Sequence, residues 1–385
     1  MHKLAKRVNI IGISKIEESL RITEQHPEII SLGAGEPDFP APPNVIKAAE
    51  KFLERGYTHY APMQGRSELR EALVRKLRKE NRIKTNEDEI LVTCGSKEAI
   101  LLSVLTLVDP SEEVIVPDPG YIGYRPIVEL VGGKAVSLKS EENDKFEYHP
   151  ENLKKLITKK TRLIIVNSPS NPTGTVFKRK TLEEIADIAV DRNLMILSDE
   201  AYEKLVYDDA RHISIASLNG MGKHVITTQT FSKTFAMCGF RVGYAVAAKD
   251  IIKEMAEFKL CTTISAPTFA QLAAVEALRG SGKYVEMMRR EYDRRRKMLI
   301  KRLNQIPDVS CIKPQGAFYA FPNITGLKMK SNRVADFLIK KAEVATVPGT
   351  EFGEYGEGYL RLSYATAYKK IETAIDRIEK AIRNI

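Results

Sequence analysis

Residues 224–247 read HVITTQTFSKTFAMCGFRVGYAVA. The stretch holds two apolar, β-branched runs, His224–Thr228 and Val242–Ala247, which predict two strands. The loop between them carries Lys233, with small and hydroxyl residues before it and Arg241 after it. A lysine amine beside hydroxyl groups and a guanidinium offers a nucleophile together with phosphate ligands. Most lysines are only solvated, so this loop indicates catalysis only if other parts of the chain supply matching groups.

Five further short apolar runs precede that stretch and alternate with segments of helical pattern. They are Ile90–Thr93, Glu113–Val116, Lys134–Leu138, Leu163–Asn167 and Leu194–Ser198. The alternation predicts an α/β fold whose mainly parallel, seven-stranded sheet is covered by helices. Ligands bind such sheets at the carboxyl ends of the strands, so the residues after each strand are the candidates for chemistry.

The pattern changes in the last third of the chain to long charged helices, beginning with Tyr284–Leu303. Two β-rich stretches, Gly316–Phe321 and Gly358–Ser363, and a helix over Lys369–Arg383 follow, which predicts a smaller α+β domain. The 385 residues suffice for two domains. The expected divisions are an N-terminal segment packing with the small domain (1–45), a large domain (46–284) and a small domain (285–385). The first segment is rich in glycine and proline, which predicts turns that cross the cleft rather than a regular element.

The formal charge of +10 raises the question of nucleic-acid binding. Basic residues alternate with acidic ones along the chain, as on solvated helix faces. The densest cluster, Arg289–Lys297, encloses Glu291 and Asp293, which favours a solvated helix over an anion or nucleic-acid patch. We therefore expect no nucleic-acid partner.

The start of the chain does not resemble a secretory signal, and no apolar run approaches the roughly 18 residues that cross a bilayer. We expect a cytoplasmic protein that does not bind membranes. The four cysteines are widely spaced and the six histidines lack metal-ligand spacing. Reduced, mostly buried thiols and no metal are expected.

A carboxylate and an amide follow two other strands. Asp199 comes directly after Leu194–Ser198, where burial is costly unless the carboxylate faces a cation or a donor. An N-cap role would also satisfy it. Asn171 lies in the turn Asn167–Gly174, and its amide can donate to an oxygen there, although turn chemistry alone also explains an asparagine.

A fourth strand end runs through Gly95, Ser96 and Lys97 into a helix. Free backbone N–H groups at a helix N-terminus suit a phosphate, but every helix that follows a strand looks similar.

Together these strand ends resemble the pyridoxal 5′-phosphate (PLP)-dependent aminotransferases of fold type I, class I, over nearly the whole chain. Residues 232–243 follow the lysine signature of that family, with Thr230 where glycine or serine is usual. Also matching, in chain order, are Gly35-Glu36-Pro37-Asp38-Phe39, Tyr57 to Gly65, Asn171-Pro172-Thr173-Gly174, Asp199-Glu200-Ala201-Tyr202 and Arg361-Leu362-Ser363-Tyr364.

The resemblance implies roles around the cofactor ring. Lys233 would hold PLP as a Schiff base and shuttle the proton at the substrate Cα. Asp199 would keep the pyridine nitrogen protonated. Tyr202 and Asn171 would hydrogen-bond the phenolic oxygen of the ring, and Tyr121, at a position where many relatives carry tryptophan, would stack on it; plain core packing is the alternative for Tyr121.

The resemblance also implies how the phosphate and the subunits are arranged. The phosphate ligands would be Gly95, Ser96, Lys97, Ser232 and Arg241. Tyr60 would reach the same phosphate from a neighbouring subunit, which implies a homodimer with shared active sites.

For the substrate, the resemblance implies that Arg361 clamps the α-carboxylate, with Asn171 and Gly35 beside it. Lys97 occupies a position where aspartate-using relatives hold a lysine near the distal carboxylate, although a surface lysine in the first turn of a helix explains it equally well. Aspartate or aromatic donors with 2-oxoglutarate are expected, and the sequence does not decide between the donors.

Other functions use the same features. A lyase or synthase of this fold would employ the same lysine, because the protein only steers the carbanion that PLP stabilises. A PLP-sensing DNA-binding regulator would need an added winged-helix module, and a catalytically silent scaffold would hold no cofactor.

Overall fold

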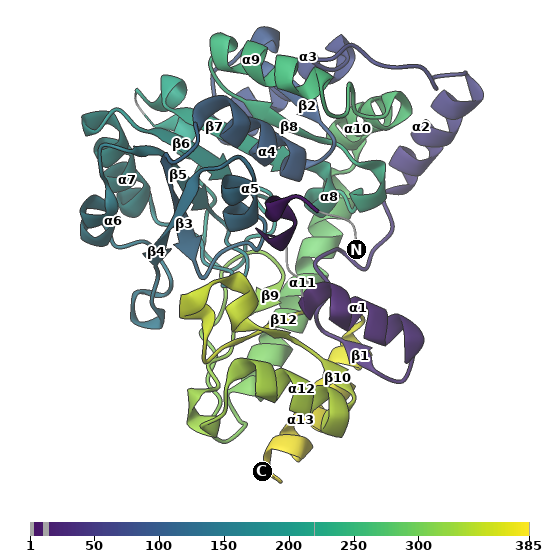
Figure 1. Ribbon diagram of the computed structural model, residues 1–385. Helices are drawn as coiled ribbons and strands as arrows, with labels where there is room; N and C mark the ends of the chain where they lie inside the picture. Colours follow the sequence, from purple (N-terminus) through teal and green to yellow (C-terminus); the bar gives the residue numbers. More distant parts are fainter. Residues whose placement is uncertain (1–3, 11–14, 219, 385) are drawn as a thin grey trace.

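The computed structural model describes residues 4–10, 15–218 and 220–384. Its centre is a seven-stranded sheet (Figure 1). The strands are β2 (Ile90–Thr93), β3 (Glu113–Asp118), β4 (Lys134–Lys139), β5 (Thr161–Asn167), β6 (Met195–Asp199), β7 (Val225–Thr230) and β8 (Gly243–Val246). All seven predicted strands are confirmed, with ends that differ by one or two residues. The order is β2-β8-β7-β6-β5-β3-β4, and only β8 runs antiparallel to its neighbours.

Helices cover both faces of this sheet, because neighbouring residues of a strand point to opposite sides. On β5, Ile164 packs in one core cluster while Leu163 and Ile165 pack in another. The helices of the first face are α6 (Pro150–Leu156) and α7 (Arg179–Asp191), and those of the second are α4 (Ser96–Leu107), α5 (Tyr124–Leu130) and α9 (Lys249–Leu260). At the β2 edge lie α2 (Pro43–Glu54), α3 (Ser67–Lys76), α8 (Phe231–Thr234) and α10 (Thr268–Gly280). The α/β fold class with a mainly parallel sheet is thus confirmed.

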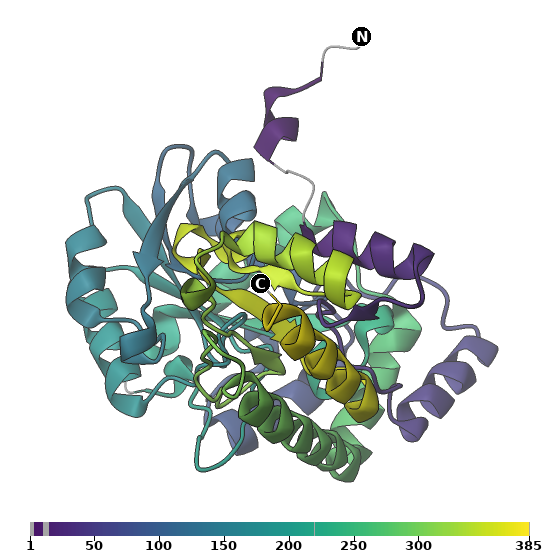
Figure 2. The same cartoon turned by 90° about the horizontal axis from the view of Figure 1, so that it is seen from below.

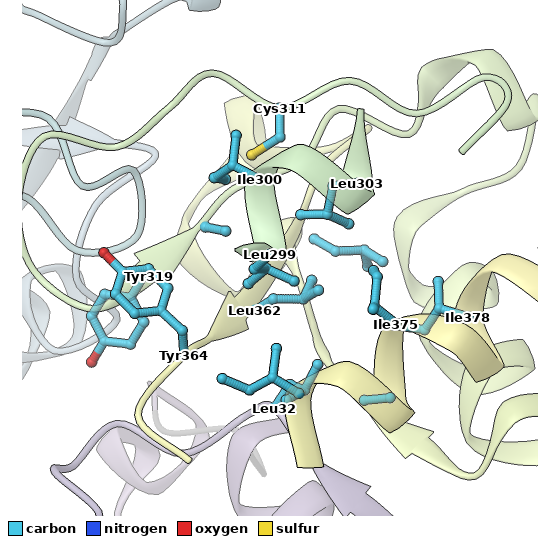
Figure 3. Close-up of a cluster of buried hydrophobic side chains, with 14 of the residues drawn as sticks. Leu32, Leu299, Ile300, Leu303, Cys311, Tyr319, Leu362, Tyr364, Ile375 and Ile378 are labelled. Carbon is cyan, nitrogen blue, oxygen red and sulfur yellow. The ribbon is translucent and has the colours of Figure 1, made fainter. Parts of the chain in front are cut away.

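The C-terminal part has its own small sheet, helices and core. Its antiparallel strands are β11 (Val347–Pro348), β12 (Leu360–Ser363) and β9 (Tyr319–Ala320), in that order. The helices are α11 (Gly282–Leu303), α12 (Ser331–Ala342) and α13 (Tyr368–Ile382), with α11 and α13 side by side (Figure 2). Figure 3 shows Leu299, Leu362 and Ile375 pointing toward one another in this core. The predicted smaller α+β arrangement is confirmed.

The N-terminal segment differs from its prediction, because it contains a regular helix, α1 (Lys15–Gln25), and a strand, β1 (Ile30–Ser31). The turn-rich residues that suggested irregular structure all follow β1. Strand β1 pairs in parallel with β10 (Val344–Ala345), and Leu32 is buried in the C-terminal core. The boundaries of the three predicted parts stay a prediction, and residues 1–3 and 11–14 of the first lie outside the described residues.

Helix α11 contains the basic cluster that was expected to be solvated. Of the six basic residues of the cluster, three are exposed (Arg290, Arg294 and Lys297) and Arg289 is half-buried, but Arg295 and Arg296 are buried, so the expectation is wrong for these two. Arg295 donates to both oxygens of Asp38 at 2.8 and 2.9 Å, and Arg296 donates to both oxygens of Asp208 at 3.0 Å. A buried guanidinium requires such pairing. The cluster therefore fastens α11 to the N-terminal segment and to the loop after β6.

The cysteines form no disulfide in the described part of the chain. Cys311 is buried, Cys94 and Cys238 are partly buried and Cys261 is exposed, so the expectation of mostly buried thiols is wrong. Across the residues that the structure describes, no helix combines the length and apolarity needed to span a membrane.

Candidate active site

A cavity of about 270 Å³ opens at the carboxyl ends of β5, β6 and β7, beside the C-terminal part. Its volume is close to the lower end of the range for small-molecule sites. Twelve of the thirteen site residues expected from the sequence line it. They are Gly35, Gly95, Ser96, Lys97, Tyr121, Asn171, Asp199, Tyr202, Ser232, Lys233, Arg241 and Arg361. Lys233 and Asp199 thus share one cavity.

The sheet itself brings the polar strand ends together. Asn167 at the end of β5 is in register with Asp199 at the end of β6, and Asp199 is in register with Thr228 on β7. The amide of Asn167 donates to the backbone oxygen of Asp199 at 3.0 Å. Parallel strands end at one edge, so residues far apart in the chain meet there.

The carboxylate of Asp199 is buried and held by two donors. The Tyr124 hydroxyl donates to its Oδ2 at 2.6 Å, and the backbone N–H of Ala201 donates to its Oδ1 at 3.2 Å. Burial raises the pKa of Asp199 to about 6, although both hydrogen bonds lower it. No Lys, Arg or His of the described residues forms a salt bridge with this carboxylate. It is therefore suited to a positively charged partner inside the cavity.

Lys233 is presented by the short helix α8. Thr230 caps this helix, because its hydroxyl accepts from the backbone N–H of Ser232 at 3.1 Å. Thr230, which stands where the family usually has glycine or serine, can therefore act as the N-cap of α8. The Lys233 amine donates to the backbone oxygen of Gly35 at 2.7 Å, so the N-terminal segment lies directly against the lysine.

A cradle of backbone N–H groups lies at the N-terminus of α4. Its N-cap, Gly95, has a φ of 82° and supplies no side-chain cap. Arg241 fastens this turn, since its guanidinium donates to the backbone oxygens of Cys94 at 3.0 Å and Cys238 at 2.9 Å. The positive end of α4 and a guanidinium therefore converge, which suits an anion such as a phosphate.

Arg361 on β12 is the most deeply buried cation of the cavity wall, at 2% exposure. It donates to the Asn171 amide oxygen at 3.2 Å and to the Gly33 backbone oxygen at 2.7 Å, while its Nε has no partner. Its guanidinium carbon lies 4.4 Å from the centre of the Tyr319 ring. Burial lowers the pKa of Arg361. No carboxylate of the described residues pairs with it, so an incoming carboxylate would satisfy a buried charge.

Two tyrosines of the site were missed by the sequence. Tyr124 donates to Asp199, and Tyr319 lines the cavity and exchanges a hydrogen bond of 2.9 Å with the Tyr202 hydroxyl. The available signal was the spacing of Tyr124 three residues after Tyr121, across the turn that leads into α5, where the two rings meet edge to face at 5.3 Å.

Tyr60 is the one expected site residue that does not line the cavity. It is 78% exposed and projects from the surface of the molecule.

A second polar cluster lies beyond Asp199 and does not belong to the cavity. Ligand atoms of Glu200, Glu203 and His212 lie within 4.8 Å of one another, an arrangement that could hold a metal ion. Lys76 forms a salt bridge with Glu203, and the Gln229 amide donates at 3.0 Å to Glu200 and to Glu203. Because the fold already supplies these partners, the cluster has a structural explanation without a metal.

Comparison with known proteins gives consistent relatives along the whole chain. A family model described as aminotransferase class I and II matches residues 27–378. The chain is 45% identical to the aspartate aminotransferase of Pyrococcus abyssi, covering 99% of this chain and 98% of that protein. It is 44% identical to the aromatic-amino-acid aminotransferase 2 of Thermococcus litoralis, with the same coverage. The crystal structure of the aromatic aminotransferase from Pyrococcus horikoshii matches with a TM-score of 0.91 at 46% identity, over 96% of this chain and 99% of that one.

Proposed function

The chain belongs to the class I and II aminotransferases, and from that premise we propose that it uses PLP carried by Lys233 to move an amino group between an L-amino acid and a 2-oxo acid. Aspartate or an aromatic amino acid is the proposed donor, in line with the names of the relatives, and 2-oxoglutarate is the proposed acceptor. The observation that carries the proposal is the meeting of the Lys233 amine and the Asp199 carboxylate in one cavity.

The residues of this cavity fit PLP. When bound, the cofactor supplies an electron-accepting ring that stabilises negative charge at the substrate Cα. Asp199 is a buried carboxylate that forms no salt bridge with any described residue, which matches a protonated ring nitrogen. The cradle at Gly95 and Arg241 matches a phosphate, and the orphaned Nε of Arg361 matches a substrate carboxylate. Each of these three features of the cavity thus has an oppositely charged partner in the cofactor or the substrate.

Lys233 and Asp199 are assigned the proton-handling roles. The Lys233 amine would hold the cofactor and then move the proton at the substrate Cα. The Asp199 carboxylate would hold a proton on the ring nitrogen, where the low polarity of its surroundings strengthens the ion pair. Tyr202 and Asn171 would donate to the phenolic oxygen of the ring, and the Tyr121 ring would cover its face.

The remaining polar residues would anchor and orient. Ser96 and Lys97 through backbone N–H groups, together with Ser232 and Arg241, would hold the phosphate. Arg361 would bind the α-carboxylate, with Gly35 closing over it.

The walls of the cavity support two classes of donor. The Lys97 ammonium lies 5.9 Å from the centre of the Tyr121 ring, at the side of the cavity, and could pair with a distal carboxylate. The rings of Tyr121 and Tyr319 with Ile122 supply apolar surface for an aromatic donor.

A homodimer is proposed because Tyr60, the expected phosphate ligand, does not line the cavity of its own chain. Tyr60 projects into solvent, and the side chains of Leu260 and Ile264 are exposed as well. Buried Lys259 ties this region together, since its ammonium donates to the backbone oxygens of Met63 and Ile264. An exposed apolar surface of this kind is typical of an interface. A partner subunit would bury it and bring Tyr60 to the phosphate. The cytoplasmic location stays a prediction.

A donor and acceptor screen tests the proposed reaction. Purified protein should be yellow, its absorbance should respond to L-aspartate or L-tyrosine, and 2-oxoglutarate should yield stoichiometric L-glutamate. Lys233→Ala should lose the absorbance of the covalently held cofactor. Ammonia or pyruvate without stoichiometric glutamate would identify a lyase instead, and a protein that cannot be made yellow would exclude the PLP assignment.

A further inference from the structure

A buried carboxylate, Asp118, joins the two parts of the molecule beside the cavity. It ends β3 and is 2% exposed. Two backbone N–H groups of the C-terminal part, those of Glu354 and Tyr355, donate to it at 3.2 and 3.0 Å. The Ser137 hydroxyl on β4 donates at 2.7 Å. No Lys, Arg or His of the described chain forms a salt bridge with it, so its burial is compensated mainly by these N–H and O–H donors, with a smaller contribution from the positive charge of Arg125.

The loop that docks on Asp118 is shaped to the carboxylate. Gly353 directly precedes the two donors and has a φ of 129°. A Cβ at this position would lie 2.0 Å from Asp118 Oδ1, so any side chain would push the loop off the carboxylate. A second cross-connection lies next to it, because the Gly120 N–H donates to the backbone oxygen of Phe352 at 2.7 Å. Loop 349–356 is therefore held both by hydrogen bonds to the Asp118 carboxylate and by a backbone hydrogen bond to Gly120.

This loop leads directly to the cation that is assigned to the substrate. The Phe352 ring is buried, and its centre lies 4.9 Å from the guanidinium carbon of Arg361. Phe352 also packs in a small apolar cluster that includes Phe146 and Ile122 from the large-sheet region and Phe321 from the C-terminal part. The position of Phe352, and with it one wall around Arg361, depends on how the loop docks.

We propose that Asp118 is a positioning residue for substrate-carboxylate binding, which holds loop 349–356 so that Phe352 keeps the Arg361 guanidinium aimed into the cavity. The inference rests on the proposed function, because it assigns Arg361 to the substrate. Asp118 does not line the cavity, and the hydrogen-bond partners of its carboxylate, Ser137, Glu354 and Tyr355, are not among the residues assigned to the cofactor. Its loss should therefore weaken substrate binding and spare the cofactor.

The test compares Asp118→Asn with the wild type, both loaded with PLP. Asparagine turns one carboxylate oxygen into an NH₂ group, which cannot accept from the docked loop. We expect the KM for 2-oxoglutarate to rise about tenfold, with kcat within about twofold and the cofactor absorbance unchanged. Calorimetry with 2-oxoglutarate and no amino donor should give the same tenfold rise in Kd.

Two further variants separate positioning from folding. Ser137→Ala removes the donor within the large sheet, together with the hydroxyl that accepts from Arg125, and should leave the KM unchanged because the docked loop keeps both of its contacts with Asp118. Gly353→Ala disturbs the same contact from the opposite side and should match Asp118→Asn, with no added effect in the double variant. An unchanged KM in both Asp118→Asn and Gly353→Ala would overturn the proposal, as would a joint fall in kcat, cofactor retention and melting temperature. A wild type that transfers no amino group to 2-oxoglutarate would instead contradict the proposed function.

Discussion

Asp199 and Arg361 are ionisable side chains that the fold buries without an opposite charge, in the part of the chain that the structure describes. Burying an unpaired charge lowers the stability of the folded chain, and such residues are found mainly where the charge binds a ligand. At Asp199 the cost shows as a pKa near 6, and at Arg361 as a lowered pKa and an orphaned Nε. Both residues should therefore oppose folding and favour binding.

Asp199→Asn is expected to stabilise the cofactor-free chain. The cost of the ionised carboxylate is fully present above pH 6, its folded pKa, and absent below about 3.8, its ordinary pKa. Removing the charge should raise the free energy of unfolding by about 1–3 kcal/mol at pH 8, with the gain vanishing near pH 3.5. Urea unfolding across this pH range measures it. PLP affinity should fall at the same time, and a variant less stable than the wild type at pH 8 would contradict the assignment.

Arg361→Ala should separate substrate binding from cofactor retention. A guanidinium that pairs with a carboxylate contributes two charged hydrogen bonds, so we expect the KM of both substrates to rise roughly 10²-fold or more. Arg361→Lys keeps the charge without the planar fork and should recover only part of the loss. Steady-state kinetics and cofactor absorbance measure the two effects, and equal loss of both would argue against the carboxylate role.

Among single residues, the sequence predicted those that follow a strand and carry a polar side chain, such as Asp199 and Asn171. It could not predict their partners. Tyr124 binds Asp199 across 75 positions of the chain, and Tyr319 meets Tyr202 across 117. A tyrosine carries no pattern that distinguishes such a contact from ordinary packing.

Among the elements, the junction of β8 with the start of α4 shapes the anion cradle most directly. A Cβ on Gly243 would lie 2.6 Å from the carbonyl carbon of Gly95 and 2.7 Å from the nitrogen of Ser96. These are backbone atoms that cannot rotate away. The absence of a side chain on β8 therefore lets the first turn of α4 approach the sheet.

Gly243→Ala should weaken PLP binding by about tenfold or more and cost about 1–3 kcal/mol of stability, because α4 must shift. Gly239→Ala is the matched control in the same loop, since a Cβ there meets nothing within 4 Å. Fluorescence titration of PLP into the cofactor-free proteins measures both. Equal affinities in the two variants would show that the approach of β8 to α4 does not shape the cradle.

The seven strands were predictable because each is a short apolar run bounded by polar residues. Helix α1 was not predicted because the glycines and prolines that indicate turns in this segment all lie after β1. The inward side of α11 was missed for another reason: a charged helix has no apolar stripe that marks its buried face. Only the partners Asp38 and Asp208, distant in the chain, show that Arg295 and Arg296 face inward.

On the scale of the whole molecule, one subunit contains every expected site residue inside its cavity except Tyr60. A site that draws one residue from each of two chains can be rebuilt from two differently damaged subunits. Mixing Tyr60→Ala with Lys233→Ala subunits, after dissociation and reassociation, should therefore restore activity. Half of the dimers would be hybrids with one intact site, which gives about a quarter of wild-type activity. Failure of the mixture to exceed the Tyr60→Ala protein alone would show that Tyr60 acts elsewhere.

The pairing of β1 with β10 joins Ile30 to Val344, about 310 residues later in the chain. A ribosome adding roughly 5–20 residues per second would synthesise Val344 some 15–60 s after Ile30. During that interval the core that buries Leu32 in the finished protein is incomplete, because it also needs Leu360, Leu362 and Ile375 from the end of the chain. The first strand to leave the ribosome is thus among the last to be fixed in place, and the nascent chain must keep its own beginning unattached until translation is nearly complete.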